Sequence, residues 1–156
     1  MMTKSEQVRF RMAAPADLGA IVALLRDDEF GQMRNPAFET ERVHYETAFG
    51  EMSADPHNGI LVMTRDGQLI GIAQLTYIRG LSYTGGLRAQ VESVRVAKQL
   101  RGFGLGGQLM SEAIRRAREK GCVLVQLTTD IRRAQTRTFY EKLGFAPSHH
   151  GMKLWL

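Results

Sequence analysis

The residues with the clearest chemical pattern form a basic, glycine-rich run, Arg101-Gly102-Phe103-Gly104-Leu105-Gly106-Gly107. The run lies between an expected strand at 89–96 and an expected helix that begins inside it. The first N–H groups of a helix have no partner within the helix and lie at the positive end of its dipole. Glycines let an anion approach such groups closely, so the run predicts a phosphate or pyrophosphate site, to which Arg101 adds positive charge.

Two other interpretations of the glycines stay open at this stage. Gly102, Gly104 and Gly107 also match G-x-G-x-x-G, and Asp130 lies near the end of the next strand, where a dinucleotide-binding protein keeps its ribose carboxylate. Against this, residues 97–101 separate the glycines from the strand, and too little chain follows Asp130 to complete a doubly wound sheet. The glycines could also serve only a tight turn between strand and helix.

The elements around the run follow from hydrophobic periodicity and turn signals. Asp66-Gly67 between two apolar runs predicts a hairpin, and Gly121 stands where a helix-terminating glycine belongs. Expected strands are 8–12, 60–64, 69–78, 89–96 and 123–128; expected helices are about 15–26, 39–52, 104–120 and 133–143; 28–35 is expected to be a loop, and 145–156 could add a last strand.

This order of elements predicts the fold class. The hairpin makes the early strands antiparallel, and the helical crossover makes the strands at 89–96 and 123–128 parallel. We therefore expect an α/β fold: one domain over residues 1–156, with a mixed, mostly antiparallel central sheet flanked by helices.

Composition narrows the classes of protein. The chain has 156 residues, of which 44% are hydrophobic and 24% charged, and its net charge is +5. With a single cysteine, no signal-peptide pattern and no membrane-length apolar run, we expect a cytoplasmic protein without a membrane partner. The basic cluster at 115–120 is interpreted as a solvated helix face, and no nucleic-acid-binding motif accompanies it, so no nucleic-acid partner is expected.

The motifs resemble those of the GNAT superfamily of N-acetyltransferases. Arg101-x-x-Gly104-x-Gly106 matches the pattern Q/R-x-x-G-x-G/A, and the match extends upstream over residues 91–96 and downstream over Phe139-Tyr140-Glu141-Lys142-Leu143-Gly144-Phe145. This resemblance implies the acyl-CoA N-acyltransferase fold, with acetyl-CoA as co-substrate and no metal. It implies acetyl transfer to a primary amine by direct attack in a ternary complex.

The resemblance also assigns residues to coenzyme A. The backbone N–H groups of the glycine run would hold the pyrophosphate, and the backbone of Val94 and Val96 would follow the pantetheine arm. The N–H of Val94 would donate to the thioester oxygen, where negative charge develops. Many family members carry asparagine where this chain has Arg133, so Arg133 is expected to contact a phosphate instead. The implied coenzyme-binding set is Val94, Arg95, Val96, Arg101, Gly102, Phe103, Gly104, Leu105, Gly106, Gly107 and Arg133.

Tyr140 and Glu92 are the expected catalytic residues. Tyr140 takes the position that faces the coenzyme sulfur in the family and would protonate the departing thiolate; the alternative is a core aromatic. Glu92 is expected in the same strand phase as Val94 and Val96, so it is either placed by a bulge or projects into a cleft. Burial would raise its pKa and suit it as a base toward the amine, directly or through water. Its alternative is a strand glutamate paired with an arginine.

The last quarter, with Arg132-Arg133, Phe139-Tyr140 and Ser148-His149, resembles the aminoalkylphosphonate acetyltransferase branch. The expected partner is a small-molecule amine, whose identity stays open, and a homodimer is possible because dimers are common in the superfamily. His149 and His150 are expected on a surface or pocket wall rather than on a metal. A dinucleotide-binding protein and a domain that binds coenzyme A without catalysis remain the alternative functions.

Overall fold

The structure, a computed structural model, describes residues 7–156 and divides into two compact units. The first ends at Gln126 and the second is Leu127–Leu156. We describe each by itself. The elements are β1 (Arg9–Met12), a 3-10 turn (Pro15–Asp17), α1 (Leu18–Leu25), α2 (Glu29–Arg34), α3 (Arg42–Ala54), β2 (Asn58–Arg65), β3 (Gln68–Arg79), α4 (Ser82–Gly85), β4 (Leu87–Val96), a 3-10 turn (Lys98–Leu100), α5 (Leu105–Glu119), β5 (Cys122–Leu127) and α6 (Ala134–Lys142).

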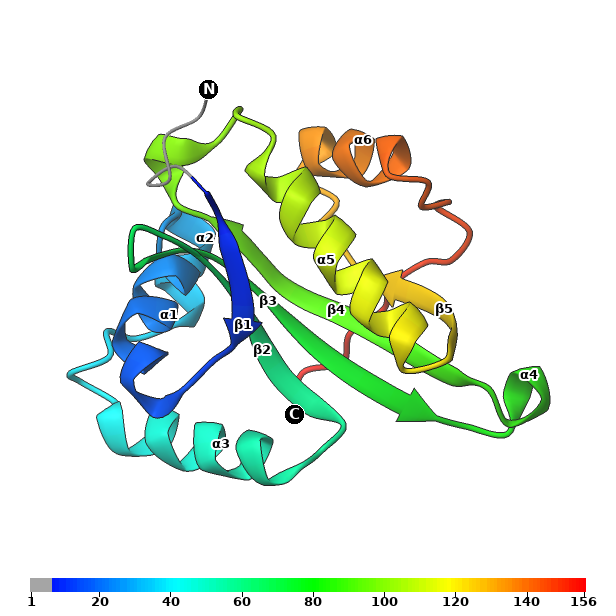
Figure 1. The fold of residues 1–156 in the computed structure, drawn as a ribbon, viewed down its shortest axis with the longest axis horizontal. Helices are drawn as coiled ribbons and strands as arrows, with labels where there is room; N and C mark the ends of the chain where they lie inside the picture. The colour runs from blue at the N-terminus through cyan, green and yellow to red at the C-terminus, as the bar shows by residue number, and fades with distance from the viewer. Residues whose placement is uncertain (1–6) are drawn as a thin grey trace. The chain divides into compact units, whose positions relative to one another are not determined.

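The five strands form one sheet in the order β1-β2-β3-β4-β5 (Figure 1). Each of the pairs β1–β2, β2–β3 and β3–β4 is antiparallel. The predicted hairpin is present, with Asp66 and Gly67 at φ 51° and 78° in its turn. The mixed, mostly antiparallel α/β fold is therefore confirmed.

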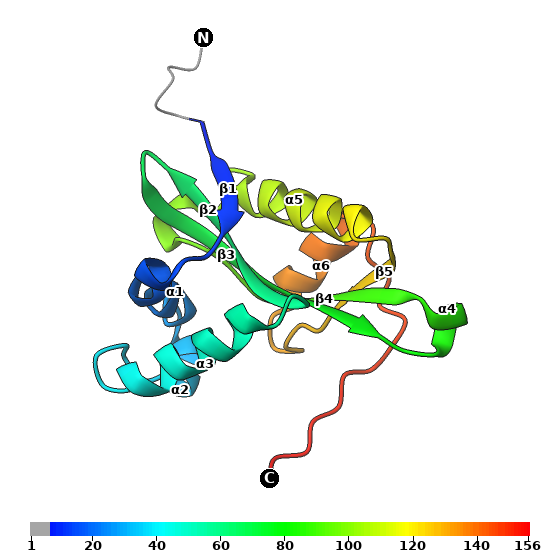
Figure 2. The ribbon, with the colours of Figure 1, turned by 60° about the horizontal axis from the view of Figure 1, so that its bottom comes forward.

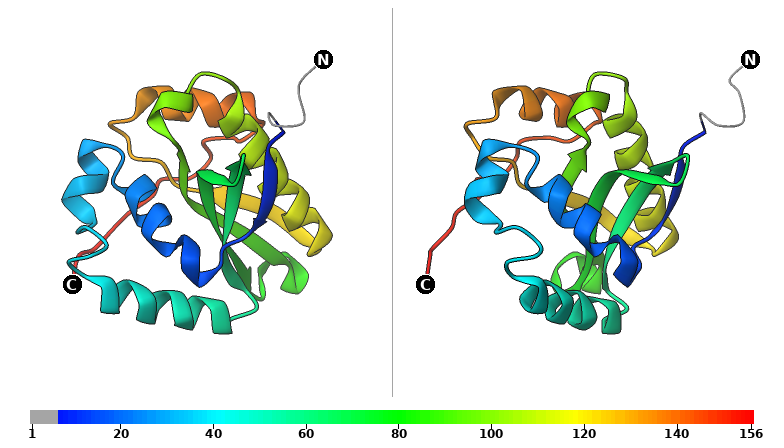
Figure 3. Two further views of the ribbon diagram at one scale, coloured as in Figure 1. Left: turned by 60° about the vertical axis from the view of Figure 1, so that its left-hand side comes forward. Right: turned by 90° about the vertical axis from the view of Figure 1, so that its left-hand side faces the viewer.

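Helices cover both faces of this sheet (Figure 2). On one face, Ile21 and Leu24 of α1 pack with Val62 and Ile72, which occupy even-numbered positions of β2 and β3. On the other face α5 lies against β3 and β4. Figure 3 shows α1 and α2 on one side of the strands and α5 on the other. Since side chains alternate along a strand, the even-numbered face of β3 is the α1 side.

Helix α5 positions the glycine run at its beginning. Its sheet-facing stripe holds it in place: Leu105, Leu109, Met110, Ala113 and Ala117 are all buried. The helix ends where Gly121, at φ 75°, adopts the left-handed conformation of a helix stop. On the solvent side, Glu112 accepts hydrogen bonds from Arg115 and Arg116, and these hold its pKa down to about 2.

The segment 28–35 was wrongly predicted as a loop. It contains α2, which begins after Asp28, whose side chain accepts a hydrogen bond from the N–H of Gly31 at 2.6 Å. Gly31 suggested a loop, but a glycine is needed at this position because the backbone of Leu25 packs closely against it. A Cβ there would lie 2.0 Å from the carbonyl oxygen of Leu25.

The second unit contains α6 and the tail that follows it. The last strand expected within 145–156 is not formed. The apolar side chains of this segment are instead exposed to solvent, with exposed fractions of 92% for Met152, 87% for Leu154 and 81% for Trp155. Within residues 7–156, no helix has the length and apolar character needed to cross a bilayer. The single domain over residues 1–156 stays a prediction.

Candidate active site

Strand β4 contains a bulge directly before its end. Ile72 pairs with Arg95 and Gln74 pairs with Glu92, so the one residue between them on β3 faces two residues of β4, Ser93 and Val94. Ser93 takes the left-handed conformation, with φ 52°. A bulge interrupts the hydrogen-bond ladder and changes the direction of the strand. It stands five residues before the turn that leads into the glycine run.

The bulge corrects the prediction for Glu92. Val91 is buried and Val96 is buried, although the two positions have opposite parity, because the extra residue shifts the alternation between them. Glu92 pairs with Gln74 and therefore lies on the α1 side, opposite to Val96, and it is exposed rather than buried. Within residues 7–156, its carboxylate has no ion pair, so the alternative of a structural Glu–Arg pair finds no support.

The glycine run has the geometry of an anion site. Gly102 and Gly104 have φ of 86° and 77°, a conformation that other residues adopt only with strain, and α5 begins at Leu105. The first N–H groups of α5, from Leu105 on, have no acceptor within the helix. Phe103 is 75% exposed. An open depression of about 550 Å³ adjoins the run; its lining residues are Gly104, Gly107, Gln108, Ser111, Glu112 and Arg115 of the run and α5, and Phe10 of β1.

Arg101 is held by contacts that sequence reasoning missed. Its Nε donates to the carbonyl oxygen of Val96 at 3.0 Å, and its Nη2 lies 3.0 Å from Asp27 Oδ2. The same Asp27 oxygen accepts the N–H of Lys98 at 2.8 Å. Asp27 thus ties the end of α1 to the start of the glycine run. Nothing in the sequence spacing indicates this pair, which is separated by 74 residues.

The first unit therefore brings together two of the predicted parts, namely the end of β4 and the glycine run. Val94 is half-buried at the bulge, and Val96 is buried on the α5 side. Arg95 pairs with Ile72 and so lies on the α1 side, where its Nη1 donates to the carbonyl of Val94 at 3.0 Å.

The second unit holds the other two predicted residues. Tyr140 on α6 is buried, with its ring edge-on to Phe139 at 5.0 Å and to Phe145 at 5.8 Å between centroids. Arg133 is half-buried directly before α6, and its N–H donates to the carbonyl of Asp130 at 2.9 Å. The roles of Tyr140 and Arg133 stay predictions.

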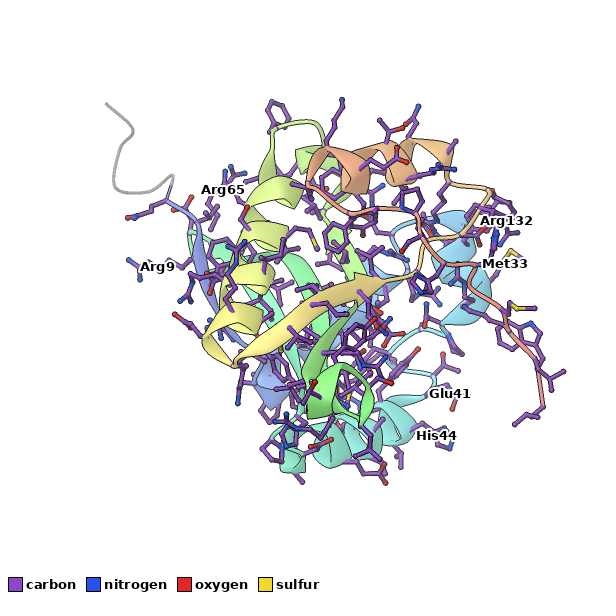
Figure 4. The ribbon with its side chains drawn as sticks, turned by 90° about the vertical axis from the view of Figure 1, so that its right-hand side faces the viewer. Arg9, Met33, Glu41, His44, Arg65 and Arg132 are labelled. Carbon is purple, nitrogen blue, oxygen red and sulfur yellow. The ribbon has the colours of Figure 1, made fainter. Side chains whose placement is uncertain are left out.

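The other candidate residues have ordinary surroundings. Asp130, the ribose carboxylate of the dinucleotide interpretation, forms an ion pair with Arg132 at 2.6 Å. His149 is exposed beside Ser148, and burial raises the pKa of the Cys122 thiol, which disfavours a thiolate. At the surface of α3, Nδ1 of His44 lies 2.6 Å from Oε2 of Glu41, and both residues are labelled in Figure 4. No group of three or more possible metal ligands occurs within residues 7–156.

A groove of about 500 Å³ lies elsewhere in the first unit, at the edge of β2 where β1 ends. Phe49 and Leu75 line its apolar part. Lys120 lies over the ring of Tyr77 at 5.5 Å, and burial raises the pKa of that tyrosine. None of the residues predicted for coenzyme binding or catalysis lines this groove.

A family model supports the motif-based prediction. Residues 20–145 match the model of the acetyltransferase (GNAT) family. The matched segment includes the bulge, the glycine run and Tyr140. The motif resemblance and the fold therefore agree with an independent comparison over most of the chain.

Two curated relatives and one solved structure are similar to the chain. Aminoalkylphosphonate N-acetyltransferase of Salmonella typhimurium is 25% identical over 96% of this chain and 94% of its own length. Glucosamine 6-phosphate N-acetyltransferase of Trypanosoma brucei brucei is 33% identical over 56% of this chain and 58% of its own. A Bacillus halodurans protein, solved as a transcriptional regulator, has a TM-score of 0.92 at 40% identity over 96% of this chain and all of its own.

Proposed function

This chain belongs to the acetyltransferase (GNAT) family, and from that premise we propose that it acetylates the primary amine of a small molecule by direct attack in a ternary complex. It is an acetyl-CoA-dependent N-acetyltransferase, with acetyl-CoA as the co-substrate. The relatives that act on an aminoalkylphosphonate and on glucosamine 6-phosphate support a small amine as the acceptor.

The bulge in β4 is the observation that carries the proposal. It removes Ser93 and Val94 from the regular ladder, next to a helix N-terminus that suits a pyrophosphate. The N–H of Val94 is then proposed to donate to the thioester oxygen and to stabilise the negative charge that develops there. The glycine run holds the other end of the same co-substrate through the first N–H groups of α5.

The chemistry needs two proton transfers. The amine nitrogen attacks the thioester carbonyl, the new C–N bond forms, and the C–S bond breaks. Glu92 is proposed to take the proton of the attacking amine, directly or through a water molecule, since its carboxylate is exposed and has no ion pair within residues 7–156. Tyr140 is proposed to return a proton to the departing thiolate. Arg133 is proposed to contact a phosphate of the coenzyme.

A thermal-shift comparison of acetyl-CoA with NAD tests the co-substrate site. The proposal expects acetyl-CoA to raise the melting temperature and NAD to leave it unchanged. A shift with NAD and none with acetyl-CoA would favour the dinucleotide interpretation instead. Thiol release in the presence of a panel of amines then separates catalysis from binding of coenzyme A alone.

A further inference from the structure

The sheet face on the α1 side changes from apolar to mostly polar along the length of the strands. Where α1 covers it, the side chains are apolar, as at Val62 and Ile72. Farther along β2, β3 and β4, most even-numbered positions on this face are polar, with Ile60 and Ile78 as apolar exceptions, and Gln126 of β5 joins the polar ones through a hydrogen bond to Gln90. We call this surface the polar face: Asn58, Gln74, Thr76, Arg88, Gln90, Glu92 and Gln126.

One end of the polar face presents hydrogen-bond acceptors. Asn58 Oδ1 accepts from Gln74 Nε2 at 3.3 Å and from Thr76 Oγ1 at 3.5 Å. Because Gln74 donates through its nitrogen, its side-chain oxygen remains an acceptor. Gln74 pairs across the strands with Glu92, so a side chain with an amide oxygen and a side chain with a carboxylate leave neighbouring positions on the same face of the sheet. An ammonium group is the complement of such a pair.

The other end presents donors. Gln90 Oε1 accepts from Gln126 Nε2 at 2.7 Å, which leaves the side-chain nitrogen of Gln90 as a donor. Gln126 Oε1 in turn accepts from Arg88 Nη1 at 3.4 Å. Arg88 is half-buried, and its guanidinium forms no ion pair within residues 7–156. A guanidinium beside an amide N–H is the complement of an oxyanion.

The spacing of these groups sets the size of a ligand. Glu92, Gln90 and Arg88 are successive positions on one face of β4. With about 3.4 Å per residue, Gln90 lies roughly 7 Å and Arg88 roughly 14 Å from Glu92 along the strand, measured between Cα atoms. Because the Arg88 side chain is long, a short spacer between ammonium and oxyanion spans the two ends.

We infer that the amine acceptor carries an oxyanion, which Arg88 and Gln90 bind while Glu92 and Gln74 receive the amine. The inference rests on the proposed function and deepens it. At the donor end, a second ammonium group would lie beside the positive charge of Arg88, which forms no ion pair within residues 7–156, so the polar face discriminates against diamines. An uncharged alkyl tail there would leave the guanidinium without a counter-charge.

Matched probes test the inference by binding. Aminopropylphosphonate, aminobutyrate, butylamine and diaminobutane share a primary amine and differ at the far end; calorimetry in the presence of coenzyme A measures each dissociation constant. We expect the two oxyanion probes to bind at least about tenfold more tightly than butylamine, as expected for charged hydrogen bonds. The phosphonate and carboxylate arms distinguish the two oxyanion types.

The variant Arg88→Gln should lose that preference, and Arg79→Gln is the matched control. Arg79 is an arginine at the end of β3 that donates to the carbonyl of Gly85, outside the polar face. Equal binding of butylamine and the oxyanion probes, or an unchanged preference in Arg88→Gln, would overturn the inference.

These outcomes are separable from failure of the proposed function. If the oxyanion probes bind in an Arg88-dependent manner but none of the amines is acetylated, acetyl transfer to small amines is wrong, while the polar face is still a binding site for amines that carry an oxyanion. If all four amines are acetylated with equal kcat/KM, the proposed function stands and the inference is wrong.

Discussion

Replacing Asp27 with alanine should weaken acetyl-CoA binding and spare the chemical step. Asp27 holds the segment before the glycine run through two contacts, to the N–H of Lys98 at 2.8 Å and to Arg101 Nη2 at 3.0 Å. Without them, the turn that leads into α5 samples conformations in which its N–H groups do not converge on one anion. Asp27 is not among the residues proposed to transfer a proton.

The size of the effect follows from the two contacts. A hydrogen bond to a charged group contributes about 1.5–3 kcal/mol, and an exposed ion pair about 0.2–1 kcal/mol. The side chains of Arg101 and Asp27 are 43% and 26% exposed, so the lower values apply. Together they give roughly 2 kcal/mol. The apparent dissociation constant then rises by up to about thirtyfold, because only the ordered fraction of the segment binds.

Calorimetry with coenzyme A measures the change in affinity, and steady-state kinetics measure whether the chemical step changes. We expect the dissociation constant and the KM for acetyl-CoA to rise together, while kcat at saturation stays within about twofold of the wild type. The control is Glu119→Ala, which removes an exposed carboxylate paired with Arg115 near the other end of α5. A fall in kcat with unchanged coenzyme affinity in Asp27→Ala would refute the reasoning.

Three further changes have defined outcomes. Tyr140→Phe should lower kcat by about a hundredfold or more without changing coenzyme affinity, and unchanged turnover in stopped assays would remove Tyr140 from the mechanism. Glu92→Gln should move the pH profile of kcat/KM to higher pH, because the amine must then lose its proton unaided; an identical profile argues against a base role. Glu112→Ala should lower Tm by about 2–4 °C at neutral pH. Since the folded pKa of Glu112, about 2, lies below its unfolded value of 4.5, its contribution is present above pH 4.5 and disappears as pH falls toward 2. A Tm difference that persists at pH 2 would contradict this assignment.

Much of the fold could be predicted because its signals are local. Asp66-Gly67 marks the hairpin, Gly121 marks the end of α5, and the apolar stripe from Leu105 to Ala117 marks the buried face of that helix. The glycine run was placed correctly for the same reason. Its pattern of types and spacing is contained in seven consecutive residues.

The errors arise where packing in three dimensions, and not the local sequence pattern, decides the outcome. Gly31 looks like a loop residue, yet it is required by the carbonyl of Leu25 within a helical turn. No glycine in the sequence marks the bulge at Ser93. Because of this bulge, Glu92 lies on the opposite face of the sheet from Val96, whereas the sequence predicted the same face. Asp27 reaches Arg101 across 74 residues, a contact that only the packing of α1 beside the sheet creates.

Initial-rate kinetics with both substrates varied test the central claim most directly. Thiol release from acetyl-CoA is followed with whichever amine of the four-probe panel reacts fastest, and the N-acetylated product is identified by mass spectrometry. Direct transfer in a ternary complex predicts intersecting double-reciprocal lines and a product that carries the acetyl group on nitrogen. Parallel lines, which indicate an acetylated enzyme intermediate, or the absence of thiol release with every amine, would contradict the account.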